Sequence, residues 1–154
     1  MREQWAEHGE SGPAQFAAMA SLLRTTAVVT AEIDRVLKRH KLTRTAYLVM
    51  VTLQMSRDMS RPLGQLSKAL LVHPTTVTMV IDQLEDAGLV VRQPHPSDRR
   101  TILASLTGKG LERVKKANAA LGEMGFGLNG TDDAAADHLA DELRKVREAL
   151  GDFG

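Results

Sequence analysis

The stretch that decides the fold covers residues 62–109, PLGQLSKALLVHPTTVTMVIDQLEDAGLVVRQPHPSDRRTILASLTGK. Each of its first two segments begins with a proline, which suits the first turn of a helix, and their patterns predict short helices over 62–70 and 74–87. Residues 89–92 and 101–106 have the composition of strands, and a loop with two prolines joins them. The predicted order is therefore helix, turn, helix and β-hairpin.

Longer helices are predicted on both sides of this stretch. The pattern stays helical over 14–40, and a helix over 43–56 is apolar nearly all round, so it should be buried. After the hairpin, a helix is predicted over 107–124, and a glycine-dense break separates it from a last helix capped by Thr131. The first helix is ~40 Å long at ~1.5 Å per residue, so part of its apolar surface is expected to meet another subunit.

Size and composition indicate one compact domain. The chain has 154 residues, of which 43% are apolar and 25% charged, and it has no cysteine, which excludes disulfides and thiolate metal sites. Its first residues are too polar for a signal peptide, and the apolar run Tyr47 to Val51 is far short of the ~20 residues that span a bilayer. A cytoplasmic protein without a membrane partner is expected.

Charge is uneven along the chain, although the formal net charge is only +1. Residues 57–116 hold ten Lys or Arg and six Asp or Glu, whereas residues 117–154 hold three and eight. A basic middle and an acidic tail indicate a polyanionic partner for the middle only. The alternative is a solvated surface over which the charges are scattered.

The helix predicted over 74–87 has the composition of a helix that reads DNA. In a helix-turn-helix, the N-terminal residues of the second helix meet the base edges in the major groove. Thr75, Thr76 and Thr78 are small, with hydroxyls that can reach bases or phosphates and methyls that can touch thymine methyls. The alternative is that these threonines merely cap and solvate an ordinary helix. The apolar positions expected to face the interior are Val77, Val80, Ile81 and Leu84.

Two adjacent arginines, Arg99 and Arg100, lie at the tip of the predicted hairpin. Arginine can exploit the negative potential of a narrow minor groove, and Asp98 is placed to hold the Arg100 guanidinium by bidentate hydrogen bonds. The alternative is a solvated turn with one local ion pair. A helix-turn-helix followed at once by such a flap predicts a winged helix-turn-helix, within a fold that is mainly α with a small β-hairpin (α+β).

Several motifs in this order and spacing resemble the MarR family of bacterial transcriptional regulators. They are Leu66–Leu70, Val77-Thr78, Leu84-Glu85, Gly88–Val90, Arg92, Asp98–Arg100 and Leu106–Gly110. The resemblance implies one domain over residues 1–154, with a winged helix-turn-helix lobe over about 42–108. It also implies a helical dimerisation layer from the N- and C-terminal helices, over about 13–40 and 107–150, and a homodimer of triangular outline.

The same resemblance implies a site for double-stranded DNA. Residues 74–79 would read the major groove, and Arg100, held by Asp98, would reach the minor groove. Arg99 would serve as a phosphate contact or as a second wing contact. Many relatives carry arginine where this chain has Gln83, so no charged contact with DNA is expected at that position. The candidate DNA-binding residues are His73, Pro74, Thr75, Thr76, Thr78, Met79, Asp98, Arg99 and Arg100.

Relatives commonly bind small aromatic or anionic compounds where the dimerisation helices meet the DNA-binding lobe, and the resemblance implies such an effector here. Trp5, Arg24, His40 and Tyr47 are the candidate pocket residues, each with the alternative of an interface or surface role. The Trp5 element is similar to a subgroup with urate-responsive members, but Leu48 stands where that subgroup's pocket is acidic. No cofactor is expected, and the five histidines show no metal-ligand spacing.

The expected function is a sequence-specific DNA-binding regulator, an effector-responsive repressor that binds a pseudo-palindromic operator as a homodimer. An enzyme is not expected, because the sequence has no glycine-rich phosphate loop, nucleophile elbow or metal-ligand cluster, and no catalytic residues are assigned. A non-specific architectural DNA binder usually has a stronger basic bias than +1. A winged helix used only for protein contact is the remaining alternative, and the paired arginines count against it.

Overall fold

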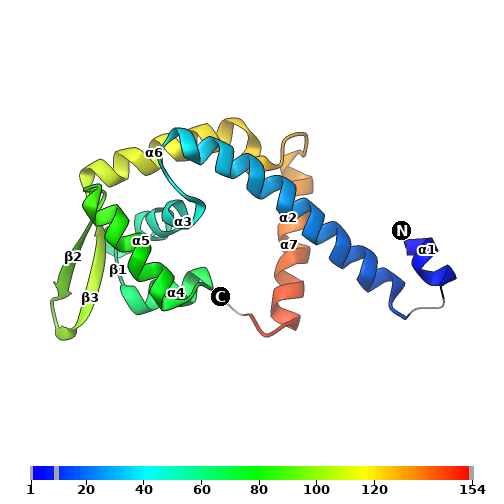
Figure 1. Cartoon of the computed structure of the whole chain (residues 1–154), viewed down its shortest axis with the longest axis horizontal. Helices are drawn as coiled ribbons and strands as arrows, with labels where there is room; N and C mark the ends of the chain where they lie inside the picture. Colours follow the sequence, from blue (N-terminus) through cyan, green and yellow to red (C-terminus); the bar gives the residue numbers. More distant parts are fainter. Residues whose placement is uncertain (1, 9–10, 153–154) are drawn as a thin grey trace.

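The computed structural model describes residues 2–8 and 11–152, except for the side chains of Arg2 and Arg99. In these residues, helices predominate over a small sheet (Figure 1). The elements in chain order are α1 (Arg2–Glu7), α2 (Pro13–Arg39), α3 (Arg44–Gln54), the 3-10 helix η1 (Arg57–Met59), β1 (Ser60–Pro62), α4 (Leu63–Leu70), α5 (Pro74–Asp86), β2 (Val90–His95), β3 (Asp98–Leu106), α6 (Gly108–Glu123), the 3-10 helix η2 (Gly125–Gly127) and α7 (Asp133–Ala149).

One lobe contains α3, α4, α5 and the sheet, as a winged helix-turn-helix requires, so the predicted fold class is confirmed. The strands are antiparallel in the order β1-β3-β2, with β1 and β2 at the edges. The core of the lobe includes the fully buried side chains of Val49, Met50 and Leu53 from α3 and Leu66 from α4. The α5 positions expected to face the interior are all buried: Val77, Val80, Ile81 and Leu84.

The hairpin is longer than the sequence predicted. β2 continues to His95 and β3 begins at Asp98, so only a tight turn joins strands that were expected to be separated by a long loop. The prediction ended the first strand before Pro94, but β2 is an edge strand, and an edge position tolerates a residue without an amide hydrogen. The ladder is irregular between Pro94 and His95.

Two further details differ from the prediction. β1 was not expected, because three residues carry no alternating pattern; the strand forms by pairing with β3, and the Ser60 and Ser105 hydroxyls are hydrogen-bonded at 2.7 Å. The cap of α7 is Asp132 instead of Thr131. The Asp132 carboxylate accepts the Ala135 amide at 2.8 Å, whereas the Thr131 hydroxyl donates to the Leu128 carbonyl.

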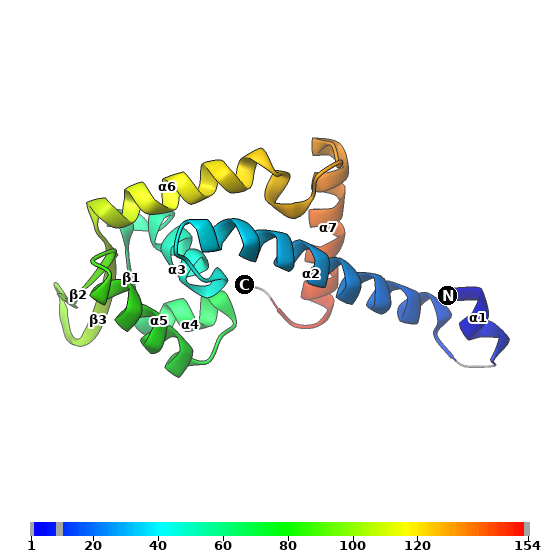
Figure 2. The ribbon, with the colours of Figure 1, turned by 45° about the horizontal axis from the view of Figure 1, so that its top comes forward.

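The N- and C-terminal helices extend away from the lobe (Figures 1 and 2). In α2 only Val36 and Leu37 are buried, near its C-terminal end, and α7 has no buried residue. Large apolar side chains are therefore exposed on these helices and on η2. They are Met19, Leu22, Leu23, Val28, Phe126, Leu139, Val146 and Leu150.

The apolar character of α2 exceeds what its short apolar runs suggested. Its most apolar 18-residue window has a mean hydropathy of 1.3, which is enough to cross a membrane by length and composition alone. Every such window of α2 contains Arg24, and a charge inside a bilayer is costly. A single helix of this kind is weak evidence for a membrane span, and an apolar helix face also suits a contact between subunits.

Candidate nucleic-acid interface

The N-terminal end of α5 presents its polar residues to solvent. Pro74 is the first residue of the helix, and the Thr75 amide donates to the His73 Nδ1 at 3.3 Å, so His73 caps the helix. Thr75 is exposed and Thr76 is half-buried, and the hydroxyl of neither makes a hydrogen bond within the described residues. Two polar groups at the start of α5 therefore remain available to a ligand.

Thr78 and Met79 extend this exposed face by another turn. The Thr78 hydroxyl donates to the Pro74 carbonyl at 3.1 Å, so it is partly satisfied within its own helix. Met79 is 56% exposed, although it follows the fully buried Val77 by only two residues. A helix that buries one face against α3 and α4 leaves this opposite face free to enter a groove.

The contact between Asp98 and Arg100 differs from the prediction. The Asp98 carboxylate accepts the Arg100 backbone amide at 3.0 Å and the Thr101 hydroxyl at 2.6 Å, so it does not hold the Arg100 guanidinium. A short aspartate side chain reaches a backbone amide two residues on more easily than a long side chain that points away. The guanidinium is exposed and has no hydrogen bond or ion pair among the described residues, and the side chain of Arg99 lies outside them.

The turn itself is stabilised by the same carboxylate. The Thr101 hydroxyl, and after it the Arg100 amide, lowers the pKa of Asp98 below its ordinary value. His95 adds a second local contact, because its Nδ1 accepts the Ser97 amide at 3.3 Å. These hydrogen bonds fix the backbone of the tip while the arginine side chain remains free.

Arg92, which sequence reasoning named only as part of a motif, connects the wing to α5. Its guanidinium donates to the carboxylates of Glu85 and Asp82, each at 2.5 Å, and its backbone amide donates to Glu85 at 3.0 Å. The backbone hydrogen bond, followed by the side-chain one, lowers the pKa of Glu85. The sequence contains a signal for this contact. Two carboxylates lie three residues apart on one helix, and an arginine lies on the next strand.

A hollow of about 460 Å³ separates the wing from the beginning of α4. Lys68 and Arg100 line it together with Gly64 and Gln65 from the first turn of α4, where the helix dipole favours an anion. The sequence between Met59 and Ile81 contains no Asp or Glu, so no carboxylate of this segment opposes these cations. Lys68 and Gln65 were not among the predicted residues, although both lie in the basic stretch 57–116 that predicted a polyanionic partner.

The structure does not bring the four candidate effector residues together. Trp5 stacks on Phe16 with a ring separation of 3.8 Å, at the end of α2 farthest from the lobe. Arg24 is exposed and lies sixteen residues before His40, which corresponds to ~24 Å along a helix. Tyr47 is buried against α6.

Tyr47 and His40, like Trp5, have structural partners. The Tyr47 hydroxyl donates to the Asn118 side chain at 2.8 Å, and burial raises the pKa of Tyr47. The His40 carbonyl accepts a hydrogen bond from Arg113 at 3.0 Å. The apolar cavity of this region, about 460 Å³, lies elsewhere, between α2, η2 and α7, and none of the four residues lines it. Within the described ranges, no group of three or more His, Asp or Glu residues could hold a metal.

The geometry can be compared with known proteins. The model of the MarR family matches residues 42–102. The chain spans 61% of the length of the first two curated relatives it matches, both HTH-type transcriptional regulators of Bacillus subtilis, at 34% and 30% identity and over 62% and 58% of this chain. These relatives are transcriptional regulators, not enzymes.

Solved structures extend the comparison to nearly the whole chain. Sco5413, a MarR family transcriptional regulator from Streptomyces coelicolor, is 36% identical with a TM-score of 0.82, over 92% of this chain and 99% of its own. Sco3205 from the same organism, solved in complex with DNA, shares the fold at 21% identity and a TM-score of 0.78, over 92% and 90%. CouR from Rhodococcus jostii RHA1, solved with p-coumaroyl-CoA, is 25% identical with a TM-score of 0.73, over 81% and 87%.

The family model matches the lobe, and the likeness to Sco5413 extends over the flanking helices as well. The protein therefore belongs to the MarR family.

Proposed function

We propose that this protein is a transcriptional regulator that binds double-stranded DNA sequence-specifically as a homodimer. One observation carries the proposal: the threonines at the start of α5 and the free guanidinium of Arg100 belong to one connected unit. Arg92 of β2 binds α5, and β2 pairs with β3, which carries Arg100 (Figure 1). A major-groove helix and a minor-groove arginine on one rigid unit suit the readout of a duplex. The DNA complex of Sco3205 supports this role for the fold.

The homodimer is supported by the uncovered apolar surface of α2, η2 and α7. Contiguous apolar surface of this kind marks an interaction site in a protein that otherwise has an ordinary charged surface. The cavity between these elements is lined mainly by apolar side chains such as Leu22, Val29 and Leu139. A second copy that covers it would place two α5 helices about one turn of DNA apart, ~34 Å, which matches a pseudo-palindromic operator.

Regulation by a small molecule is the finer part of the proposal. CouR was solved with p-coumaroyl-CoA, and in the present chain α6 connects the lobe to the terminal helices. The Asn118 side chain of α6 contacts both Tyr47 and Gln54 of α3, so a shift of the terminal helices reaches the lobe. A ligand that favours a dimer with the wrong α5 spacing would release DNA, and this protein would then act as a repressor.

Selection of bound duplexes from a random pool tests the proposal. We expect a pseudo-palindromic motif, and Thr76→Ala is expected to change the base preference at one position in each half-site because a hydroxyl and a methyl group are lost. The proposal fails if the wild-type protein binds every duplex with the same affinity at physiological ionic strength. An unchanged motif for Thr76→Ala would refute the reading role of that residue alone.

A further inference from the structure

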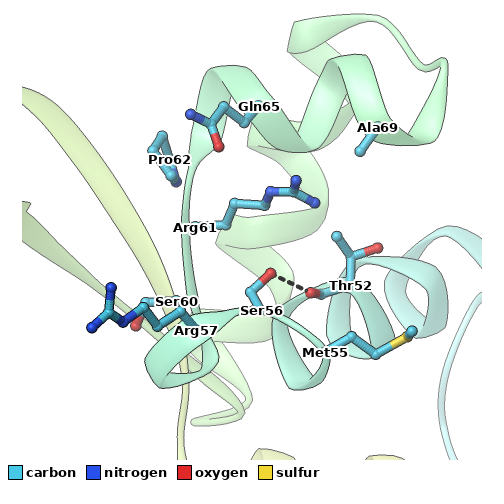
Figure 3. Close-up of a pocket in the computed structure, with 9 residues that line it drawn as sticks. All are labelled: Thr52, Met55, Ser56, Arg57, Ser60, Arg61, Pro62, Gln65 and Ala69. Carbon is cyan, nitrogen blue, oxygen red and sulfur yellow. Dashed lines mark hydrogen bonds between the residues drawn. The ribbon is translucent and has the colours of Figure 1, made fainter. Parts of the chain in front are cut away.

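A second hollow, of about 500 Å³, lies beside β1 on the edge of the sheet opposite β2. Its walls come from the C-terminal end of α3, from η1 and β1, and from α4 (Figure 3). Ser60 of β1 pairs with Ser105, and Pro62 pairs with Leu103, so the hollow lies at the base of the wing and away from its tip. It is therefore distant from the wing tip, although Pro62 and Gln65 line both this hollow and the one next to Arg100.

Arg61 is the residue that gives this hollow its chemistry. Its side chain extends from β1 into the space between α4 and the end of α3 (Figure 3). It is half-buried, yet within the described residues its guanidinium has no ion pair and no hydrogen bond. Arg92, also half-buried, is satisfied by two carboxylates. Removing an arginine from water without a counter-charge is unfavourable, so the environment of Arg61 favours an anion.

The other walls of the hollow define what kind of anion fits. Thr52 and Gln65 contribute a hydroxyl and an amide that make no side-chain hydrogen bond in the described part of the chain. No carboxylate lines the hollow. Met55, which is 83% exposed, and Ala69 supply an apolar wall next to these polar groups. An occupant therefore needs a negatively charged head and a compact apolar body.

We infer that this hollow is a binding site for a small organic carboxylate. The guanidinium of Arg61 can take both carboxylate oxygens in a bidentate pair, with the Thr52 hydroxyl as a further donor, and the apolar body would lie against Met55 and Ala69. A volume of about 500 Å³ is within the range of small-molecule pockets, ~300–1,000 Å³. Because the site lies between α3 and α4, an occupant would contact both the core helix and the first helix of the helix-turn-helix.

Calorimetric titration of the free, full-length protein with benzoate tests this inference. We expect saturable binding of benzoate and none of benzamide, which has the same shape without the charge. Arg61→Gln is expected to weaken benzoate binding at least tenfold, and Arg61→Lys to restore part of it. Arg57→Gln is the matched control: it removes the same charge at the rim of the hollow, but its side chain is 97% exposed and points away from the hollow (Figure 3).

Several outcomes would overturn the inference. These are equal benzoate affinity in the wild type and Arg61→Gln, equal losses in Arg61→Gln and Arg57→Gln, or tighter binding of inorganic phosphate than of benzoate. If Arg61→Gln leaves benzoate binding intact but weakens binding to long DNA duplexes more than to short ones, Arg61 is a DNA contact instead. Thermal melting of each variant confirms that it is folded. Because the titration contains no DNA, its result is independent of the proposed regulator function.

Discussion

At the scale of single residues, the wing and α5 contain two kinds of polar residue. Some stabilise the local structure through hydrogen bonds within the protein, and others have side chains that remain available to a ligand. His73, Asp98 and Arg92 use their polar atoms within the protein, on the α5 cap, the wing turn and the wing-to-helix contact. Arg100 and Thr76 have no such partners in the described residues. Mutations in the first group should therefore lower the stability of the fold, whereas mutations in the second group should weaken DNA binding and leave the fold unchanged.

Replacing Arg100 by Ala should weaken operator binding by about 1–3 kcal/mol without changing the dimer or its melting temperature, because the guanidinium has no structural partner. A gel shift on the selected duplex measures the affinity. Arg57→Ala, which removes another exposed charge at η1, should leave the midpoint unchanged. Equal midpoints for the wild type and Arg100→Ala would count against the role of the wing.

Glu85 gives a prediction on pH. Its folded-state pKa is lowered by Arg92, so the carboxylate stabilises the fold at pH values above its unfolded pKa of ~4.3, and this contribution is lost as pH falls through the lower folded value. Glu85→Gln should therefore melt at a lower temperature than the wild type at pH 7, and the difference should shrink below pH ~4. A difference that stays constant from pH 7 to pH 3 would contradict an electrostatic role.

At the scale of elements, the contact between α6 and the end of α5 depends on a glycine. A Cβ added at Gly110 would lie 2.1 Å from the Leu89 carbonyl oxygen, which is far inside van der Waals contact. The same segment is fixed by Thr107, whose hydroxyl accepts the Gly110 amide at 3.0 Å and donates to the Gly88 carbonyl at 2.9 Å. The start of α6 is thus held against the turn that follows α5.

Gly110→Ala should lower the free energy of unfolding by about 1–3 kcal/mol, because the backbone of α6 must move away from Leu89. Gly122→Ala in the same helix is the control: nothing lies within 4 Å of its added Cβ, so alanine's better helix propensity should stabilise the protein by up to ~1 kcal/mol. Chemical denaturation of both variants measures the two effects. Changes of the same sign would show that close packing at Gly110 is not decisive.

At the scale of the whole molecule, the terminal helices contribute almost nothing to the core of a single protomer. The side chains of α7 are exposed or half-buried, and Met19, Leu22 and Leu23 in the N-terminal half of α2 are exposed as well. Within one copy, only the C-terminal part of α2 is fixed by the lobe, through Val36 and Leu37. In the proposed homodimer, a second copy would cover the apolar side chains of these two helices.

Leu23→Glu should convert the proposed dimer to a monomer and remove operator binding, because it would place a charge on the apolar surface of α2, at a residue that is 63% exposed in one protomer. Light scattering coupled to size-exclusion chromatography measures the mass. Met55→Glu, a similar change at an exposed apolar residue of the lobe, should remain dimeric. A dimeric Leu23→Glu variant would place the interface elsewhere.

Local patterns determined much of this protein. Most elements were predicted correctly from signals that act within one or two helical turns. These signals are the prolines and threonines at the starts of helices, the glycines after α5 and α6, and the spacing of the buried residues Val77, Val80, Ile81 and Leu84. The error at the start of α7 was one residue, since both Thr131 and Asp132 are good caps. The candidate DNA-binding residues stay predictions that the binding experiments will test.

Only the tertiary structure decided contacts between residues far apart in the chain. Pairing with β3 creates β1, the edge position of β2 accommodates Pro94, and the approach of β2 to α5 gives Arg92 its two carboxylates. Asp98 selected a backbone amide over the Arg100 guanidinium because the tight turn brings that amide within reach. The four proposed effector residues were separated for the same reason: a rigid helix sets distances that composition does not contain.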